Sequence, residues 1–333
     1  MPLSENHRKR DFKRTTEPRG EAARILRQLD ELCAAERRGT LTFTGGRKLS
    51  VTNLDKKFFP EGYTKGDLLK YYTTVSRLIL PAVKDRPLVL RRFPNGIKGP
   101  AFYQQKAQDE PKDVRVETVV NDAGERQRRI IGGDLLTLLY TIQLGAISVD
   151  PWHARVGSLD HADYAVIDLD PGPRAPFSRV VDAARWAKEV LDEYGLHAAL
   201  KTSGATGLHV YVPLPPRTPN EAATLVAQMV ATRVAEEHPK HATIVRWVKQ
   251  RGTTTIYVDY LQNIRGKTLA GVYCVRARNG ATVSTPLEWS ALDSPLDPRD
   301  FTIATVPARF AQTGDIWKTA MKRRNSLAPL LPR

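Results

Sequence analysis

The sequence is poor in cysteine and has no long apolar run. Only Cys33 and Cys274 occur in its 333 residues, far apart and with no cluster of histidines beside them. A disulfide framework and a structural zinc site are therefore not indicated, and any metal ion would have to be held by oxygen ligands. No stretch approaches the roughly 18 consecutive apolar residues of a membrane span, and the basic start of the chain contains no secretory signal. We expect a cytoplasmic protein that does not enter a membrane.

Positive charge, in contrast, is abundant. Lysine and arginine number 51 against 36 aspartates and glutamates, which gives a formal net charge of +15. Such a chain is attracted to polyanions, and nucleic acid is the leading candidate partner. The positive charge could instead serve binding to an anionic membrane surface or simple solubility, and charge alone does not distinguish these explanations. A binding or catalytic site is needed to choose between them. The 41% of hydrophobic residues suffices for one large domain or two intimate ones.

The chain divides into a basic N-terminal extension and a main fold. Residues 1–20 are polar and rich in Lys and Arg, which is typical of a disordered arm. Apolar residues then recur at helical spacing over 21–38. We therefore expect an extension with one helix over residues 1–45 and a catalytic domain over residues 46–333.

The main fold is expected to be α+β. Its long β-rich stretches favour mixed or antiparallel sheets flanked by helices over a doubly wound parallel sheet. The patterns predict helices over 64–81 (ended by Pro81), 134–144, 178–194 and 221–237, a hairpin around 121–125, and strands over 87–92, 164–170, 198–201, 208–214, 254–260 and 269–278.

The sharpest local feature is YAVIDLDPGP, residues 164–173. Side chains at i and i+2 of a strand lie on one face, so Asp168 and Asp170 point the same way, and Pro-Gly-Pro places them at a sheet margin. A divalent cation is the simplest way to keep two such close carboxylates ionised. The alternative is a polar strand end that leads into a turn.

A third acid has a similar setting. Asp259 follows the β-rich run 255–258, which again places a carboxylate near the end of a strand. Three acids carried by strands suit two metal ions, which can activate an attacking hydroxyl and stabilise a leaving pyrophosphate.

Between these acids lies KTSGATGLHVYVPL, residues 201–214. Ser203, Gly204 and Gly207 allow a tight turn whose backbone N–H groups could meet phosphate oxygens, with the Ser203 hydroxyl and His209 as further donors. The spacing is not that of a Walker A loop. An ordinary β-hairpin with a half-buried His209 is the alternative.

Basic residues follow the third acid. Lys267 comes soon after Asp259, and a strand over 269–278 would place Arg276 and Arg278 on one face. Arginines on one face suit a polyphosphate or a nucleic acid backbone. A solvated basic face is the alternative.

An aromatic pair lies earlier in the chain. Phe102 and Tyr103 follow the basic pair Arg91 and Arg92. Exposed rings there could stack on unpaired bases. Buried core aromatics are the alternative.

The order of these motifs resembles the polymerase domain of bacterial ligase D and its stand-alone relatives in the archaeo-eukaryotic primase superfamily. The resemblance covers about residues 48–289 and includes TKGDLL, RRFPNG, PAFYQQK, DLDPGP, KTSGATGLHVYVPL, VDYLQN, VRAR and VSTPLEW in consistent order. It implies the primase-polymerase (archaeo-eukaryotic primase) fold.

The resemblance also implies roles for individual residues. Asp168, Asp170 and Asp259 would be the catalytic acids and would bind two Mn²⁺ or Mg²⁺ ions. Lys56 and Lys65 would recognise a 5′-phosphate on the downstream strand. The template would contact Phe102 and Tyr103, and the incoming nucleotide would be bound by Ser203, His209, Arg251, Lys267, Arg276 and Arg278. The Arg251 assignment is the weaker one, because its spacing to Asp259 is one residue longer here.

Two features depart from the ligase D pattern. Asp150 precedes Pro151 and Trp152 where many ligase D domains have histidine, so the role of that histidine is in doubt. The chain has no K-x-D-G adenylation motif and no length left for a ligase or phosphoesterase module. A free-standing polymerase is therefore expected.

These observations predict a template-directed DNA or RNA polymerase of the primase type, a monomer at the bacterial nucleoid. It would extend primers at gaps or broken ends in DNA repair or non-homologous end joining. Its substrates would be nucleoside or deoxynucleoside triphosphates and DNA with gaps, overhangs or 5′-phosphate ends; Ku and a separate DNA ligase are partners that only the resemblance implies. A metal-dependent nuclease and a non-catalytic DNA-end-binding module are the alternatives. Priming, gap filling and end joining are not distinguished, nor are the two kinds of sugar.

Overall fold

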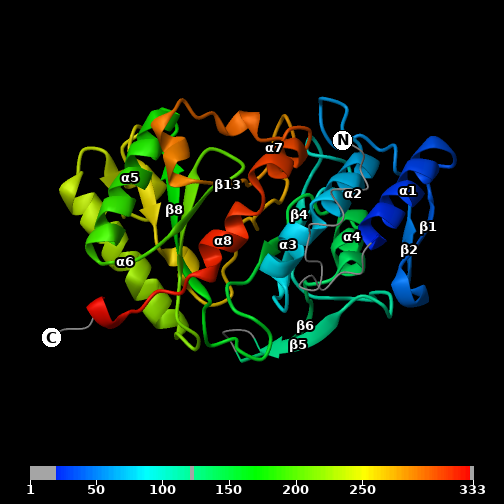
Figure 1. Ribbon diagram of the computed structural model, residues 1–333, viewed down its shortest axis with the longest axis horizontal. Helices are drawn as coiled ribbons and strands as arrows, with labels where there is room; N and C mark the ends of the chain where they lie inside the picture. The colour runs from blue at the N-terminus through cyan, green and yellow to red at the C-terminus, as the bar shows by residue number, and fades with distance from the viewer. Residues whose placement is uncertain (1–19, 121–123, 331–333) are drawn as a thin grey trace.

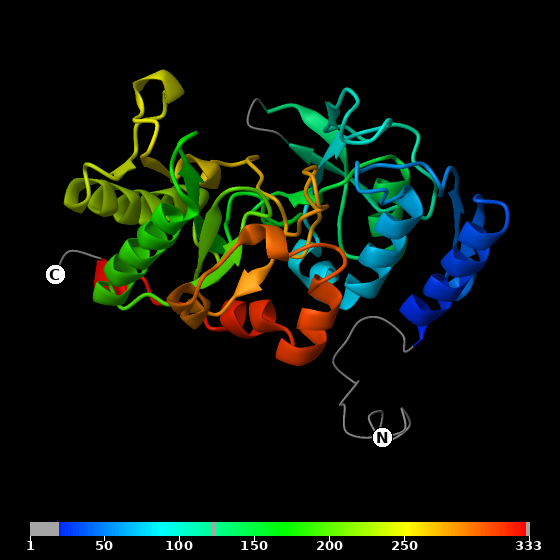
Figure 2. The same cartoon turned by 90° about the horizontal axis from the view of Figure 1, so that it is seen from above.

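The computed structural model describes residues 20–120 and 124–330, so the expected basic arm and the tip of the expected hairpin lie outside the described residues. Two halves lie side by side, one built on a large sheet and one mainly helical (Figures 1 and 2). Helices α7 (Val306–Thr313) and α8 (Ile316–Lys322) lie near their junction. No helix within the described ranges is long and apolar enough to cross a membrane.

The helical half comes from the first part of the chain. The side chains of Ile25 and Leu29 in its first helix are fully buried in the same core as the rest of the protein. Its elements are α1 (Glu21–Ala34), β1 (Gly39–Thr42), β2 (Lys48–Val51), α2 (Lys65–Thr74), α3 (Ser76–Val83), β3 (Leu88–Arg92), β4 (Phe102–Gln104), β5 (Val116–Val120), β6 (Arg126–Ile130), α4 (Leu135–Gln143) and β7 (Asp150–Pro151).

The helix expected over 64–81 begins as predicted but is divided. Thr64 and Asp67 form a capping box at the start of α2. The break comes at Val75, where the hydroxyl of Ser76 donates to the carbonyl oxygen of Thr73 at 2.8 Å. A second helix, α3, then runs past Pro81 to Val83, so the expectation that Pro81 ends the helix was wrong.

The large sheet has six strands in the order β11-β12-β8-β10-β9-β13. All neighbours are antiparallel except β11 and β12, which confirms the expected α+β class with a mixed sheet. Helices α5 (Phe177–Glu193) and α6 (Asn220–Glu237) cover one face of it (Figure 1). The strands are β8 (Tyr164–Pro171), β9 (Ala199–Thr202), β10 (Leu208–Pro213), β11 (Ala242–Thr243), β12 (Ile256–Asp259) and β13 (Pro286–Leu287).

Short 3-10 helices complete the described chain. They are η2 (Thr44–Gly46), η3 (Val248–Gln250), η4 (Leu261–Asn263), η5 (Trp289–Asp293), η6 (Pro298–Asp300) and η7 (Ala328–Leu330).

The strand expected over 269–278 does not form. Tyr273 adopts the left-handed backbone conformation with φ of 61°, which interrupts an extended chain. Only an isolated bridge between Val275 and Val283 remains. The segment is apolar because it is buried in the core, and the prediction that Arg276 and Arg278 share a strand face was therefore wrong.

Candidate active site

Four strands of the large sheet place a row of polar side chains on the face turned away from α5 and α6. The register pairs Asp168 of β8 with Asp259 of β12 on one side and with His209 of β10 on the other, and His209 with Lys201 of β9. Residues paired directly across antiparallel strands project from the same face. We call Asp259, Asp168, His209 and Lys201 the polar row.

Asp168 is the centre of this row. Its side chain is 5% exposed, and burial, followed by the charge of Asp259, raises its pKa to about 7. The Nε2 atom of His209 lies 3.2 Å from its Oδ1, but the geometry is not that of a hydrogen bond, and Oδ1 has no hydrogen-bond donor among the described residues. A buried carboxylate oxygen without a partner is costly unless a cation or a donor is supplied from outside.

Asp170 and Asp259 complete the acidic group. Asp170 lies at the exposed end of β8, and its pKa is raised to about 7 by partial desolvation and then by the charges of Asp168 and Asp259. Asp259 is fixed by three donors: the Tyr257 hydroxyl, the Leu261 N–H and the Gln262 side chain, at 3.1, 2.8 and 2.8 Å. The structure therefore brings the three predicted acids together on one face of the sheet, where the C-terminal part of β8 pairs with β12.

Lys201 and His209 form the other half of the row. The Nζ atom of Lys201 is fully buried and donates to the Ala270 carbonyl at 3.0 Å and the Ser284 hydroxyl at 2.7 Å. It also lies 2.7 Å from Nδ1 of His209. Burial lowers the pKa of Lys201 to about 7, and burial and the charge of Lys201 lower that of His209 well below its usual value. A lysine that donates to Nδ1 leaves the neutral imidazole with its proton on Nε2, toward Asp168.

The turn between β9 and β10 is tight, but it is closed on itself. The hydroxyl oxygen of Ser203 accepts the N–H groups of Ala205 at 3.1 Å and Gly207 at 3.0 Å. A Cβ on Gly207 would come within 2.3 Å of the carbonyl oxygen of Leu169, between the two acids of β8. Two of the N–H groups that we expected to face phosphate are therefore engaged by Ser203.

The predicted arginines differ in their placement. Arg276 lies beside the row, where its guanidinium donates to the Ser203 carbonyl at 3.0 Å and its charge lowers the pKa of Asp168. Arg251 covers the ring of Tyr257 at 3.4 Å, beside Asp170.

Lys267 and Arg278 lie apart from these residues. Both are exposed, and neither makes a side-chain contact with the three acids within the described ranges.

The two lysines assigned to a 5′-phosphate lie together away from the row. The N–H of Lys65, at the first position of α2, donates to the carbonyl of Lys56 at 2.9 Å. Lys65 is 5% exposed, and burial, then the charge of Lys56, lower its pKa to about 8. Two ammonium groups beside a helix N-terminus favour an anion.

Phe102 and Tyr103 are exposed, by 48% and 64%, so the core-aromatic alternative is excluded for both. Each ring is backed by an arginine of β3: Arg92 lies 5.2 Å from the ring centre of Phe102 and Arg91 5.7 Å from that of Tyr103. They border an open hollow of about 510 Å³. Arginine-backed exposed rings suit stacking on unpaired bases.

The sequence patterns did not predict every residue that shapes the site. Lys201 opens the segment 201–214, but only the register reveals that it pairs with His209. The side chain of Asn263 bonds both the N–H and the carbonyl of Val166, at 2.7 Å each, and so continues the sheet where β12 ends. Asp150, the departure from the ligase D pattern, has a pKa raised by burial and lowered in part by Arg276 and Lys201, so it lies close to the row.

Oxygen ligands for a cation are present, but they are not arranged as a finished chelate. Within the part of the chain that the structure describes, no three His, Cys, Asp or Glu side chains are grouped as a metal site. Asp259 is occupied by its donors, whereas the Oδ1 atom of Asp168 is free. The donor set fits a hard divalent cation that replaces some of these contacts.

Comparison with known proteins agrees with this architecture. The family model for the primase-polymerase domain of LigD matches residues 64–317. The chain belongs to the LigD primase-polymerase family. A solved structure of the polymerase domain from Mycobacterium tuberculosis Ligase D in complex with DNA aligns with a TM-score of 0.75 and 30% identity, over 83% of this chain and 99% of that chain. The fold is thus the archaeo-eukaryotic primase fold of LigD polymerase domains.

Two LigD proteins show how much of a longer relative this chain matches. It is 34% identical over 269 residues to the bifunctional non-homologous end joining protein LigD of Bacillus subtilis, which covers 80% of this chain and 43% of the relative. It is 31% identical over 274 residues to the multifunctional non-homologous end joining protein LigD of Pseudomonas aeruginosa, which covers 81% of this chain and 32% of the relative. The chain therefore spans less than half the length of these LigD proteins.

Proposed function

We propose that this LigD-family chain is a template-directed nucleotidyltransferase that extends primers at gaps or broken DNA ends. The observation that carries the proposal is the convergence of Asp168, Asp170 and Asp259 on one sheet face, with a buried carboxylate oxygen that lacks a partner. The names of the LigD relatives support non-homologous end joining as the pathway. Ku and a separate ligase as partners, and a monomer as the acting form, are part of the proposal and rest on the sequence resemblance alone.

The three aspartates are proposed to hold two Mn²⁺ or Mg²⁺ ions. When bound, such ions activate the attacking 3′-hydroxyl and neutralise charge on the leaving pyrophosphate. The chain's own contribution is to fix the acids: the sheet register aligns Asp168 with Asp259, and the donors from Tyr257 and Gln262 hold Asp259 in place. Most of the catalytic effect would then be positioning and electrostatic.

Basic groups beside the row are proposed to bind the nucleotide. Arg276 and Arg251 bring two guanidinium groups to the acids, and Ser203 shapes the adjacent turn. His209 is 2% exposed, with its ring nitrogens toward Lys201 and Asp168. We therefore propose that Lys201 positions the His209 ring beside Asp168, and that His209 acts mainly on this acid rather than by direct contact with the nucleotide.

DNA is proposed to occupy two further positions. Lys56 and Lys65 would bind a 5′-phosphate on the downstream strand, because Lys65 begins α2 and feels the charge of Lys56. The Lys56 ammonium donates to Oδ1 of Asn95 at 2.8 Å, and neither lysine has an acidic partner within the described residues. Phe102 and Tyr103 would stack on the template, because their rings are exposed and backed by arginines.

Primer extension tests this function. With a labelled primer on gapped DNA, Mn²⁺ and nucleotides, Asp168→Ala and Asp259→Ala should each reduce nucleotide addition at least about a hundredfold while leaving DNA binding largely intact. Asp182→Ala, on α5 behind the sheet, is the matched control and should extend normally. Undiminished extension by either active-site variant would refute the assignment.

The same assay separates the alternatives. Shortening of the primer without extension would identify a metal-dependent nuclease. DNA binding without any turnover that depends on metal would identify a non-catalytic end-binding module. Comparing ribo- with deoxyribonucleotides, on DNA with and without a 5′-phosphate, then defines the preferred sugar and end.

A further inference from the structure

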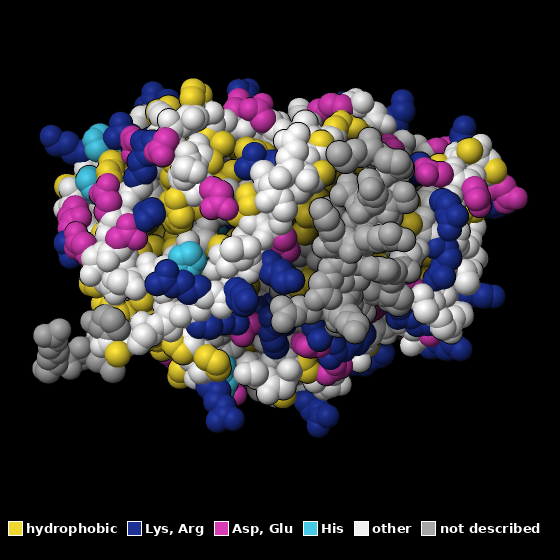
Figure 3. Space-filling view, in the orientation of Figure 1, with side chains coloured by type: hydrophobic (Ala, Val, Ile, Leu, Met, Phe, Trp, Pro, Cys, Tyr) yellow, Lys and Arg dark blue, Asp and Glu magenta, His cyan; other side chains and the backbone are white. Residues whose placement is uncertain are grey.

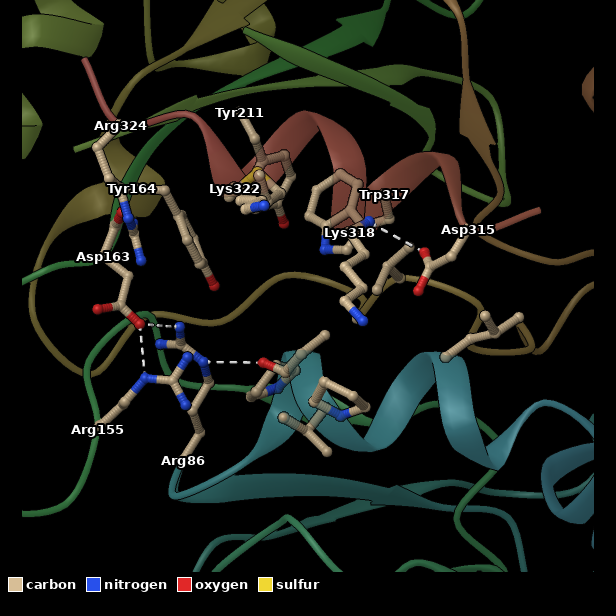
Figure 4. A pocket seen from close by; sticks show the side chains of 18 residues that line it. Arg86, Arg155, Asp163, Tyr164, Tyr211, Asp315, Trp317, Lys318, Lys322 and Arg324 are labelled. Carbon is tan, nitrogen blue, oxygen red and sulfur yellow. Dashed lines mark hydrogen bonds and ion pairs between the residues drawn. The ribbon is translucent and has the colours of Figure 1, made fainter. Parts of the chain in front are cut away.

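A second cavity, of about 290 Å³, lies between α3 and α8 (Figure 4). Leu78 of α3 and Trp317 and Met321 of α8 contribute apolar walls. Tyr164 of β8 and Tyr211 of β10 line it from the large sheet. The cavity is at the lower limit of the roughly 300 to 1,000 Å³ typical of ligand pockets, which favours a small ligand.

This cavity is separate from the polar row. Tyr211 lies two residues from His209, and Tyr164 four residues from Asp168, on the same strand faces. At about 3.3 Å per residue these offsets correspond to about 7 and 13 Å along the strands. None of the three acids and none of the residues proposed to bind the incoming nucleotide lines the cavity.

Two lysines of α8 bring unpaired positive charge to the cavity. Lys318 extends from α8 toward α3, and Lys322 follows one turn later (Figure 4). Neither ammonium group makes an ion pair or a hydrogen bond within the described ranges. Arg324 lies beside them, with one guanidinium nitrogen donating to the Asp163 carbonyl at 2.6 Å. Lys and Arg side chains also gather around α8 on the molecular surface (Figure 3).

Within the described ranges, the acids of the cavity form no ion pair with these lysines. The carboxylate of Asp163 pairs with Arg86 and, at 2.7 Å, with Nε of Arg155. The carboxylate of Asp315 accepts the backbone N–H of Lys318 at 3.0 Å and thereby caps α8, and it is also hydrogen-bonded by the side chain of Tyr273. The charge of Lys318 acts on this carboxylate and favours its ionised form, but the two side chains form no ion pair. An anion could therefore approach Lys318 and Lys322 without breaking an ion pair, although Lys318 already lies in the field of Asp315.

Two hydroxyl groups also face the cavity. The phenols of Tyr164 and Tyr211 point toward its interior (Figure 4). Neither hydroxyl has a hydrogen-bond partner in the described part of the chain. Apolar walls with a few convergent polar groups are the usual composition of a small-molecule site.

We propose that this cavity is a second, non-catalytic site that binds one phosphorylated nucleoside. Lys318, Lys322 and Arg324 would bind the phosphate, whose charge of about −1.5 to −2 at neutral pH suits two free ammonium groups. The base and sugar would pack on Met321 and the apolar walls and bond the tyrosine hydroxyls. The small volume admits a single nucleotide unit, either free or at the end of a strand.

Calorimetric titration of the full chain with AMP in EDTA tests the proposal. We expect Lys318→Ala/Lys322→Ala to weaken AMP binding at least tenfold, because both ammonium groups are lost. Met321→Trp, which fills the cavity and keeps the lysines, should also abolish binding. Arg323→Ala, an exposed neighbour that does not line the cavity, and Ser203→Ala at the polymerase site should bind AMP as the parent does.

The outcomes decide the site and its ligand. AMP affinity within twofold of the parent in the double lysine variant would overturn the proposal, as would adenosine binding as tightly as AMP or an absence of AMP binding at millimolar concentration. A thermal unfolding scan shows that each variant is folded. Equal binding of a 5′-phosphorylated dinucleotide, weakened by the same lysine changes, would identify strand ends as the ligand; binding of AMP alone would identify free nucleotides.

Discussion

Recognition of a 5′-phosphate by this chain should depend on the protonation of Lys65. Burial, and then the charge of Lys56, lower the pKa of Lys65 from 10.5 to about 8. Lys65 is therefore charged at pH 7 and about nine tenths neutral at pH 9. The phosphate has a second pKa of about 6 and stays doubly charged over this range. A change in its affinity between pH 7 and pH 9 therefore comes from the protein.

The expected effect follows from that pKa. Above pH 8, the protonated fraction of Lys65 falls about tenfold for each pH unit. The contribution of its ammonium group to phosphate binding therefore falls by about 1.4 kcal/mol per pH unit. The preference for 5′-phosphorylated over 5′-hydroxyl gapped DNA, measured as a ratio of Kd values, should fall about tenfold between pH 7 and pH 9. Lys65→Arg should keep its preference at pH 9, because a guanidinium remains charged there.

The same pKa has a consequence for stability that requires no DNA. Because the pKa is lower in the folded state than in the unfolded state, the protonated lysine destabilises the fold at pH 7, by up to about 3 kcal/mol. This cost disappears as the pH rises from about 8 to 10.5. Lys65→Met should therefore raise the free energy of unfolding in urea at pH 7, with a gain that vanishes near pH 10.5.

Unfolding in urea tests the lowered pKa of Lys65, and the pH dependence of the 5′-phosphate preference tests whether Lys65 binds the phosphate. If Lys65→Met is no more stable than the parent at pH 7, the lowered pKa is wrong. If the stability gain is found but the parent prefers a 5′-phosphate equally at pH 7 and pH 9, Lys65 does not bind that phosphate.

Three further substitutions test the polymerase site and the template surface. Gly207→Ala should lower both stability and extension, because its Cβ would lie 2.3 Å from the Leu169 carbonyl oxygen and displace β8; thermal unfolding and primer extension measure the two effects. Lys201→Met should slow extension at saturating nucleotide about tenfold or more, because His209 loses the donor that sets its tautomer, and should cost about 1 to 3 kcal/mol in urea unfolding. Tyr103→Ala should weaken binding to an unpaired template by about 1 to 3 kcal/mol, measured by fluorescence anisotropy, because stacking area is lost.

The glycine and tyrosine changes each have a matched control. Gly157→Ala has no neighbour within 4 Å and a positive φ, so it should cost only about 1 kcal/mol and leave extension unchanged. Leu225→Ala removes another exposed apolar side chain, on α6, and should not affect template binding. Normal extension in Lys201→Met, or template binding by Tyr103→Ala equal to that of the parent, would contradict the corresponding role.

Local patterns in the sequence predicted the strands that carry the three acids. The run 164–170 predicted a strand with Asp168 and Asp170 on one face, and the β-rich run before Asp259 predicted a second. Both strands form, and their register brings the carboxylates together. The contact between Lys201 and His209 could not be predicted in the same way, because it depends on which residues of two strands pair and not on either strand alone.

Long-range contacts also explain why the strand predicted over residues 269–278 does not form. The run 269–278 has the apolar composition of a strand, yet Tyr273 has a positive φ and Gly271 lies against the Val149 carbonyl, where a Cβ would come within 2.8 Å. Burial between the two halves accounts for its apolar residues, and composition alone does not distinguish such a segment from a strand. Arg276 nevertheless reaches the row, because its guanidinium bonds the turn at Ser203.

The pairing of β8 with neighbours on both sides sets a limit on how this protein can change. Deleting a single residue from the middle of β8 would turn its carboxylates toward α5 and α6 and send Ile167 and Leu169 to the opposite side. Point substitutions can adjust the chemistry of the row gradually, but a change in strand length cannot. Natural variation in length should therefore collect in the connecting loops, while β8 and the two strands paired with it, β12 and β10, keep their lengths.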